Sequence, residues 1–357
     1  MVLGVLSGEG IGPEVITCAL DLLRVLKDSG NHRFDIRHGG VIGRDAEKMH
    51  GLSLSDEATA FCRDIFDAGG AILNGPGGGR YVYDLRKRFD LYFKISPLVV
   101  CPELAGANRL KAEAVEGTNI LLVRDNVGGI YQGSSREGFN ETGERYIEHS
   151  FQDSEPMVRR FLEAAARLSL QRRGNLVVVC KDSGVPGISA LWRQCANEIA
   201  EVTGVSCQMV DIDHMAYRLI QHAQDLDVIA APNMCGDVLA DLGAALLGSR
   251  GVSFSGNYSP DGAAVYQTNH GAAYDLAGTD RANPVGQIFS LAMALRESFN
   301  LSEEADWIEQ ATHSVWADGW RTEDIAESGC RIISTREMGR RIAGRLEEVI
   351  QMKQSAA

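Results

Sequence analysis

The chain of 357 residues is long enough for one large domain or two intertwined ones. Its apolar fraction of 45% and charged fraction of 23% are typical of a soluble globular protein. The net charge of −13 argues against nucleic acid or an anionic membrane as a partner, although a local arginine cluster would still allow an anionic substrate. The cysteines are scattered without a CxxC pair, and no stretch predicts a signal peptide or a membrane span, so we expect a cytoplasmic protein.

Apolar runs and helical periodicities alternate along most of the chain, which predicts an α/β architecture. The predicted strands are residues 2–6, 70–73, 120–123, 176–179 and 228–231. The predicted helices, with apolar residues at helical spacing, are residues 13–27, 155–169 and 191–202. The GxGxxG, GxxxxGK[ST], GxSxG and HExxH signatures are absent, which counts against a Rossmann dinucleotide site and against hydrolase or zinc-protease chemistry.

Several polar segments follow the predicted strands. The segment Ser7-Gly8-Glu9-Gly10-Ile11-Gly12 follows the first strand, and the glycine-rich loop at 75–79 follows the second, where α/β proteins keep active sites. The remaining segments carry basic, phenolic or amide groups. They are Leu85-Arg86-Lys87-Arg88, Val123-Arg124-Asp125-Asn126-Val127-Gly128-Gly129-Ile130-Tyr131, Val179-Cys180-Lys181 and Asn269-His270-Gly271-Ala272-Ala273-Tyr274-Asp275.

The most informative segment follows the strand at 228–231 and reads Asn233-Met234-Cys235-Gly236-Asp237-Val238-Leu239-Ala240-Asp241. Gly236 is expected to release the chain into a helix, on which Asp237 and Asp241 share one face. Two carboxylates at such a junction form half of an oxygen-rich site for Mg²⁺ or Mn²⁺. A solvated helix face is the alternative, but the apolar neighbours of both acids favour the metal site.

Taken in this order, the segments closely resemble the β-hydroxyacid oxidative decarboxylases, the isopropylmalate and isocitrate dehydrogenase family. The Gly-Gly-Ile-Tyr sequence at 128–131 is nearest to the 3-isopropylmalate dehydrogenases. The resemblance implies two α/β domains that share a twisted central sheet, and not a Rossmann fold. Residues 1–97 and 246–357 would form the terminal, cofactor-binding domain, and residues 98–245 the middle domain with the dimer contacts and the metal site.

The resemblance also implies the reaction. A 3-substituted malate, which is a 2-hydroxyacid with a carboxylate at C3, would lose hydride to NAD⁺ and then CO₂ to give a 2-keto acid, with a divalent cation polarising the hydroxyl. Lys181 would be the general base and Tyr131 the proton donor. The metal ligands would be Asp237, Asp241 and Asp213, with Asp211 the near rival of Asp213. Lys181 and Asp213 would reach into the partner's site, so an obligate homodimer is implied.

The cofactor residues follow from the same resemblance. Asp275 stands where NAD-using members place an acid against the ribose 2′-hydroxyl, and a carboxylate there repels the 2′-phosphate of NADP. His270, Gly271 and Asn283 match the loop around the adenine.

The match fails at the substrate-orienting positions. Arg86 and Arg124 are present, but Ser96 stands where the family usually has a second arginine, and Lys94 replaces the usual asparagine and could return the charge from a different angle. In the family, aliphatic residues in the loop before Arg86 contact the C3 substituent of the substrate. This chain has Arg80 and Tyr83 in that loop. Arg80 could bind an anionic substituent, and a solvated loop residue is an equally open interpretation.

These departures favour retained chemistry on a non-standard 3-substituted malate. Two alternatives stay open. One is the housekeeping 3-isopropylmalate dehydrogenase of leucine biosynthesis, against which Ser96 and the polar loop count. The other is a non-catalytic regulatory paralogue, which would need a lost lysine, tyrosine or aspartate.

Overall fold

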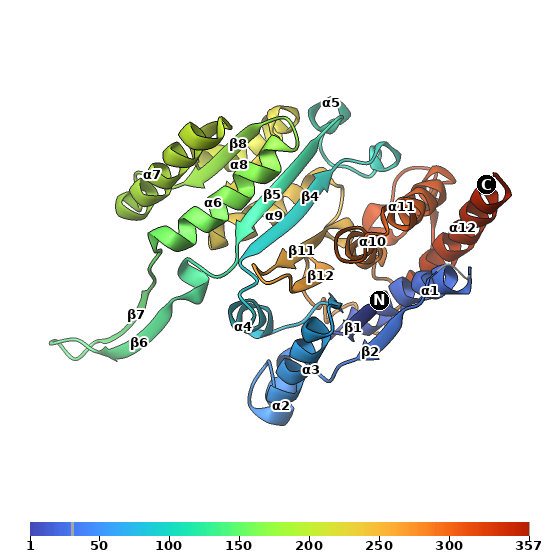
Figure 1. The fold of residues 1–357 in the computed structure, drawn as a ribbon, viewed down its shortest axis with the longest axis horizontal. Coiled ribbons are helices and arrows are strands. Elements are labelled where there is room, and N and C mark those ends of the chain that lie inside the picture. The colour runs from blue at the N-terminus through green and yellow to red at the C-terminus, as the bar shows by residue number, and fades with distance from the viewer. Residues whose placement is uncertain (30–31, 357) are drawn as a thin grey trace.

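A computed structural model of the chain describes residues 1–29 and 32–356 and is built around a ten-stranded mixed sheet (Figure 1). In spatial order the strands are β2 (Asp35–His38), β1 (Val2–Leu6), β3 (Ala71–Asn74), β12 (Ala264–Thr268), β11 (Phe254–Tyr258), β4 (Phe93–Val99), β5 (Asn119–Asp125), β10 (Val228–Ala231), β8 (Asn175–Cys180) and β9 (Ser206–Asp211). The five predicted strands are all present, with ends that differ by at most two residues.

The sheet has two parallel halves that antiparallel strands join. Strands β2, β1, β3 and β12 are parallel to one another, as are β5, β10, β8 and β9. Strands β11 and β4 connect the halves through antiparallel pairs. This order is not that of a Rossmann sheet, so the predicted fold class is confirmed. The first half uses strands from both ends of the chain and the second half strands from its middle, but the domain boundaries stay a prediction.

The helices cover the sheet and include the three that the sequence predicts. They are α1 (Gly12–Asp28), α2 (Gly43–His50), α3 (Asp56–Asp67), α4 (Tyr81–Arg88), α5 (Ala112–Val115), α6 (Glu155–Leu170), α7 (Pro186–Thr203), α8 (Ile212–Gln221), α9 (Asn233–Leu246), α10 (Val285–Phe299), α11 (Ser302–Ala317) and α12 (Thr335–Ala356). Five short 3₁₀ turns, at Pro102–Leu104, Ile130–Gln132, Ala223–Asp225, Arg250–Val252 and Glu323–Ile325, complete the connections together with the two-residue strands β13 (Trp320–Arg321) and β14 (Arg331–Ile332). None of the helices in the described part of the chain is long and apolar enough to cross a membrane.

Alternation along the strands explains how helices cover both faces of the middle half. On β8, Val178 packs in one buried cluster with Phe161 of α6 and Trp192 of α7. Its neighbour Val177 packs in another cluster with Met215 of α8. Successive strand residues point to opposite faces, so α6 and α7 lie on one face and α8 lies on the other, together with α9.

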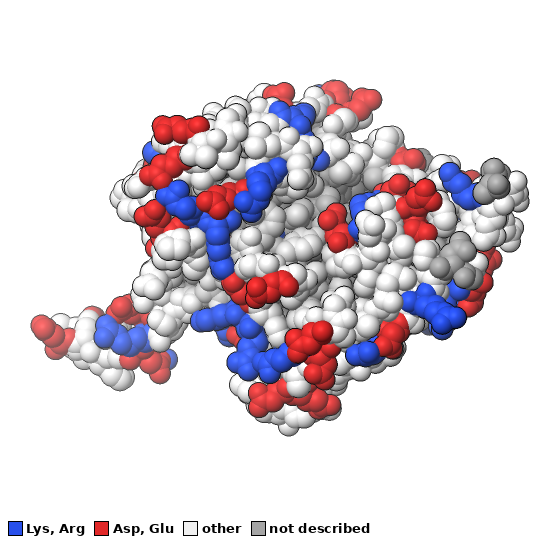
Figure 2. All heavy atoms as spheres, viewed as in Figure 1, with Lys and Arg blue, Asp and Glu red and all other residues white. Residues whose placement is uncertain are grey.

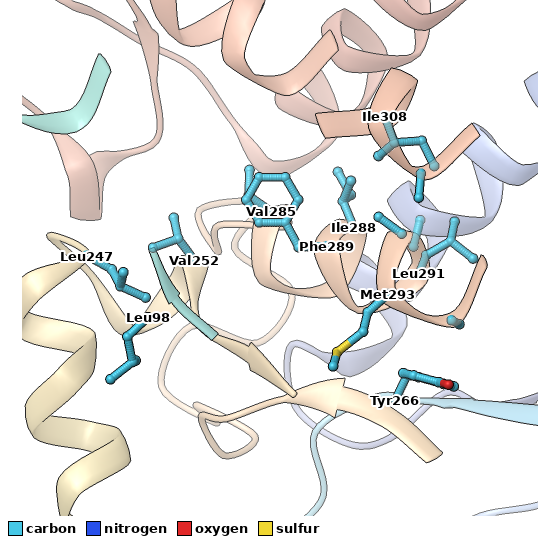
Figure 3. Close-up of a cluster of buried hydrophobic side chains, with 14 of the residues drawn as sticks. Leu98, Leu247, Val252, Tyr266, Val285, Ile288, Phe289, Leu291, Met293 and Ile308 are labelled. Carbon is cyan, nitrogen blue, oxygen red and sulfur yellow. The ribbon is translucent and has the colours of Figure 1, made fainter. Parts of the chain in front are cut away.

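The largest core cluster runs through both halves of the sheet (Figure 3). Leu98 of β4 and Leu247, which follows α9, belong to it, together with Ile288 and Leu291 of α10. Helix α10 is buried from residue 285 to residue 295 and packs between the sheet and α11. The two halves are therefore joined by a continuous apolar core.

A two-stranded hairpin, β6 (Ser134–Phe139) and β7 (Arg145–Ser150), projects from the rest of the molecule (Figure 1). Its side chains are almost all exposed, including those of Phe139 and Ile147, at 73% and 68%. Over the face in Figure 2, acidic and basic side chains lie close to one another in most places.

Because Leu291 is completely buried in the main core, Leu291→Ala should lower the free energy of unfolding by about 2–5 kcal/mol through lost burial and a residual cavity. Urea unfolding followed by circular dichroism measures the change. Leu52→Ala is the matched control, since Leu52 is 59% exposed, and its effect should stay within about 0.5 kcal/mol. Equal losses in both variants would contradict the assignment of the core.

Candidate active site

The candidate active site lies where α9 crosses one face of β4 and β5. Along β4, the side chains of Lys94, Ser96 and Leu98 point to the same face because strand residues alternate. Leu98 packs against α9, where a Cβ on Gly243 would come within 2.5 Å of Leu98 Cδ1. On β5, Arg124 is the register partner of Lys94. The basic side chains of β4 and β5 are therefore brought beneath α9.

Helix α9 begins at Asn233, three residues before the predicted start, so the expectation that Gly236 releases the chain into the helix is wrong. Gly236 instead lies inside the first turns, where a Cβ would stand only 2.8 Å from Arg124 Cγ. The glycine is needed because the arginine passes directly under the helix. Asp237 and Asp241 are four residues apart within α9 and share one face, as predicted.

Arg124 is almost completely buried and is held by the start of α9. Its Nε and Nη2 donate to Asn233 Oδ1 at 3.0 and 2.8 Å, and its Nη1 donates to Asp237 Oδ1. Asn233 Nδ2 in turn donates to the carbonyl of Gly128 at 2.8 Å. Burial alone would raise the pKa of Asp237, but Arg124 and Lys94 outweigh it and hold that pKa below its ordinary value. Sequence reasoning missed Asn233, although its place at the end of a buried strand was a usable signal.

Two other cations at the site have no anionic partner. Arg86 and Lys94 have residue exposures of 4% and 3%. Arg86 Nε is buried without a hydrogen-bond partner, and neither side chain forms an ion pair with a described residue. Burial, with Arg124 nearby, lowers the pKa of Arg86, and burial with Arg86 and Arg124 lowers the pKa of Lys94 well below its ordinary value. The carboxylates of Asp237 and Asp241 act in the opposite direction on Lys94.

Tyr131 packs beside these cations. Its ring centroid lies 5.3 Å from that of Tyr83, and the guanidinium of Arg124 lies 5.7 Å from its centroid. Burial and the Asp237 carboxylate raise the pKa of Tyr131 to about 12. At neutral pH the phenol therefore holds its proton, which suits the predicted proton donor.

Two carboxylates that the sequence reasoning missed, the buried Asp125 and the partly buried Asp153, hold the loop before Tyr131. Asp125 Oδ1 accepts from the backbone N–H groups of Val127 and Gly128 at 3.0 and 3.3 Å. Asp153 Oδ1 accepts from the N–H of Gly129 at 3.1 Å, and its other oxygen accepts from an indole on α7 at 2.9 Å. Burial and Asp153 raise the pKa of Asp125 to about 6. An acid directly after Arg124 in a Gly-Gly loop was the available signal.

Ser96 and Asp241 face the cofactor side of the site. Ser96 Oγ donates to Asn269 Oδ1 at 3.2 Å, and Asn269 Nδ2 donates to Ser253 Oγ at 2.7 Å. Asp241 forms an ion pair with Arg250 at 3.0 Å, and both side chains are half-exposed. Ser96 is therefore bonded to the loop that contains the predicted cofactor residues.

Arg80 and Tyr83 lie at the outer edge of the site, on and just before α4. The Arg80 side chain is 62% exposed, pairs with Asp84 at 3.7 Å and donates to the carbonyl of Tyr131 at 3.4 Å. The guanidinium groups of Arg80 and Arg86 lie 5.6 and 5.8 Å from the centroid of the Tyr83 ring. Arg80 is thus largely exposed, has only long contacts with Asp84 and the Tyr131 carbonyl, and lies close to Tyr131.

Lys181 and Asp213 form a separate group at the ends of β8 and β9. Lys181 Nζ lies 2.6 Å from Asp213 Oδ1 and 3.4 Å from Asp211 Oδ2. Asp211 also accepts from the backbone N–H of Asp182 at 3.0 Å, so it holds the turn after β8, whereas Asp213 is 70% exposed. Asp213 raises the pKa of Lys181 through this contact. Throughout the described residues, no hydrogen bond or ion pair joins this group to Asp237 or Asp241 of the same chain.

The predicted cofactor residues lie on the loop after β12 and at the start of α10. His270 Nε2 is buried without a hydrogen-bond partner, and burial lowers the pKa of His270. Gly271 and Asp275 are exposed. Asn283 is buried. It accepts from the N–H of Val285 at 3.0 Å and donates to Asp324 at 3.1 Å, so it also fixes the start of α10.

Glu9 ties the cofactor side together, and sequence reasoning did not single it out. Its carboxylate accepts from the N–H groups of Asp45 and Gly78 at 2.7 Å each and from the Tyr274 hydroxyl at 3.0 Å. Gly10 has a φ of +58°, and a Cβ there would lie 2.0 Å from the carbonyl oxygen of Ala272. The first loop, the glycine-rich loop and the histidine loop therefore pack as one unit.

Comparison with known proteins identifies the family of this chain. The model of the isocitrate/isopropylmalate dehydrogenase family matches residues 2–342. A 3-isopropylmalate dehydrogenase of Pseudomonas fluorescens is 35% identical over 360 aligned residues, which cover 97% of this chain and 98% of the relative. The chain belongs to the isocitrate/isopropylmalate dehydrogenase family.

Other relatives support the same placement. A 3-isopropylmalate dehydrogenase of Geobacillus kaustophilus is 34% identical, with coverage of 94% of this chain and 93% of the relative. The crystal structure of isocitrate dehydrogenase from Methylococcus capsulatus has a TM-score of 0.84 at 25% identity and covers 97% of this chain and 99% of that one. Members of this family are NAD-dependent decarboxylating dehydrogenases, so the predicted enzyme class, oxidative decarboxylation of a hydroxyacid, is confirmed.

The ionised carboxylate of Asp125 should lower the free energy of unfolding of this protein. Its folded-state pKa of about 6 lies above the ordinary value, so folding is penalised where the carboxylate is ionised, above pH 6, and the penalty disappears as the pH falls towards 4. Asp125→Asn keeps the acceptor oxygen and should raise the free energy of unfolding at pH 8 by about 1–3 kcal/mol.

Urea unfolding at pH 8 and pH 4.5 measures this effect, with Asp64→Asn on the exposed face of α3 as the control. The gain for Asp125→Asn should be much smaller at pH 4.5. A destabilised variant at pH 8, or the same gain at both pH values, would show that the ionised carboxylate is not penalised there.

Proposed function

We propose that the protein is an NAD- and divalent-metal-dependent oxidative decarboxylase of a 3-substituted malate other than 3-isopropylmalate. One observation carries the proposal. The groups expected to bind metal and transfer protons are present, while the position of the second clamp arginine is held by a buried serine bonded to Asn269. An arginine–carboxylate contact is bidentate and charge-assisted, and its loss costs a matched substrate about 2–4 kcal/mol.

Asp237 and Asp241 fit a hard divalent cation. Both offer carboxylate oxygens from one face of α9, and their side chains are 40% and 51% exposed and so can be reached. Arg124 and Arg250 now occupy these carboxylates and would have to share them with the cation. A bound Mg²⁺ or Mn²⁺ would polarise the substrate hydroxyl and carry negative charge after decarboxylation.

The chain's own residues supply orientation and proton transfer. Arg124 and Arg86 would hold substrate carboxylates, and Tyr131 has a protonated phenol ready to donate to the carbon that loses CO₂. Lys181 would take the proton of the hydroxyl. Asp213 and Asp211 raise the pKa of Lys181 in this chain, so loss of the Asp213 contact would lower that pKa and favour the base.

The cofactor loop fits NAD. His270 Nε2 is a buried nitrogen without a partner, which a ligand group can satisfy. Asp275 is exposed and forms no ion pair with any residue in the described ranges, so its carboxylate is free for a ribose hydroxyl. NAD would accept the hydride.

A homodimer with shared sites is part of the proposal. Lys181 is paired with Asp213 and Asp237 with Arg124, and no ion pair among the described residues of one chain joins the two groups, which supports sites shared between two chains. The β6–β7 hairpin projects with exposed Phe139 and Ile147, which supports a role in holding a second copy.

One of the two alternative functions has specific support. The relatives named 3-isopropylmalate dehydrogenase favour that activity, and growth of a leucine auxotroph that carries this gene would establish it. A non-catalytic regulatory role has little support, because the lysine, tyrosine and aspartates expected for catalysis are all in place.

The substrate is tested by NADH formation over a panel of 3-substituted malates, with wild type and Ser96→Arg. The wild type should prefer a malate other than 3-isopropylmalate. Ser96→Arg should raise activity on 3-isopropylmalate about 10-fold or more and lower it on the preferred substrate, because the guanidinium pairs with a carboxylate that the serine cannot hold.

High wild-type activity on 3-isopropylmalate would replace the proposal with the housekeeping function. Loss of activity on every malate in Ser96→Arg would assign Ser96 to packing against Asn269.

Shared sites are tested by mixing two inactive homodimers, Lys181→Ala and Asp237→Asn. After reassembly, one of the two sites in each heterodimer is built from intact residues, so up to about half of the heterodimer's activity should return. Native mass spectrometry confirms that heterodimers form. Heterodimers without activity would mean that each site belongs to one chain.

A further inference from the structure

Three cations are buried at the site, and only one of them has a carboxylate partner. Arg86, Lys94 and Arg124 have residue exposures of 4%, 3% and 3%. Arg124 is bonded to Asp237, whereas Arg86 Nε is buried without a hydrogen-bond partner and Lys94, itself buried, forms no ion pair with any residue in the part of the chain that the structure describes. Buried charges are normally paired. The two free cations therefore point to an anion that is supplied by a ligand.

The position of Lys94 relates it to Ser96. Both side chains lie on the face of β4 that is turned to α9, two residues apart, which corresponds to about 6.6 Å along the strand. Lys94 is paired in register with Arg124 on one side and with Asn257 on the other. The charge missing at position 96 is thus present at position 94, next to Arg86.

We propose that Lys94 is the specificity-determining residue of this site and forms with Arg86 an anion subsite that holds one carboxylate of the hydroxy-dicarboxylate substrate. The inference rests on the proposed function and deepens it. The ammonium is a compact point charge with rotatable donors, whereas arginine offers a planar fork. The subsite therefore accepts a carboxylate that is displaced towards α4 and away from Asn269, which a fork at position 96 would not hold.

A buried lysine without a partner lowers stability, so its presence indicates a functional role. Burial and the neighbouring guanidinium groups disfavour the charged form of Lys94, as its lowered pKa shows. Replacing it with methionine removes this cost at similar volume. The variant should therefore melt at a higher temperature than the wild type while binding the anion less well.

The experiment compares wild type with Lys94→Met, Lys94→Gln, Lys94→Asn and the double variant Lys94→Asn/Ser96→Arg, with Lys111→Met as a control at an exposed lysine. D-malate is the probe, and its dissociation constant is measured by isothermal titration calorimetry with Mg²⁺ and without NAD. The melting temperature of the free protein and the KM and kcat for the best substrate of the malate panel are measured on the same samples.

Lys94→Met and Lys94→Gln should both weaken D-malate binding about 10-fold or more, since each removes a charged contact. Lys94→Met should raise the melting temperature, and Lys111→Met should change neither quantity. The double variant should bind D-malate better than Lys94→Asn alone and shift turnover towards 3-isopropylmalate. Lys94→Gln keeps the test valid where Lys94→Met fails to fold.

Wild-type affinity in Lys94→Met or Lys94→Gln would overturn the inference, as would a wild type that does not bind D-malate. The proposed function can fail separately. Lys94-dependent binding of D-malate without turnover on any malate would leave the subsite in place and remove the proposed reaction. Turnover on a substituted malate with an unchanged KM in Lys94→Met would support the proposed reaction and reject the Lys94 subsite.

Discussion

The contact of Arg124 with the start of α9 is the interaction on which the rest of the site depends. Three guanidinium nitrogens donate hydrogen bonds to Asn233 and Asp237, and the Asn233 amide in turn donates to the carbonyl of Gly128. One buried side chain on β5 therefore fixes the direction of α9 and the loop that carries Tyr131. Removing one partner of such a buried, charge-assisted network costs more than the bonds gained by forming it, because the remaining charge is left unpaired.

Electrostatics divides the site into two regions with different requirements. Around Arg124 the cations outnumber the carboxylates, so the region suits anionic substrate groups. Around Lys181 the carboxylates of Asp211 and Asp213 outnumber the cation, so the region suits a metal or another positive group. No hydrogen bond or ion pair among the described residues of one chain joins the two regions, so their charges are balanced separately.

Much of the fold could be predicted from the sequence because apolar runs and helical spacing mark buried strands and amphipathic helices. The start of α9 could not, since Gly236 is a helix breaker by propensity and is required here only because Arg124 passes under it. Tyr131, Arg124 and Asp237 could be expected together from the resemblance. The hydrogen bonds of Asn233, Asp125 and Glu9 could not, because they depend on which loops meet in three dimensions.

The hydrogen bonds of Glu9 also bear on the energetics of cofactor binding. Its carboxylate fastens three loops from distant parts of the chain before any ligand arrives. The conformational entropy of ordering those loops is then lost during folding, so the cofactor does not lose it again when it binds. Because these loops are ordered in advance, the cofactor needs fewer direct contacts for a given affinity. The product dinucleotide can also leave without the loops becoming disordered.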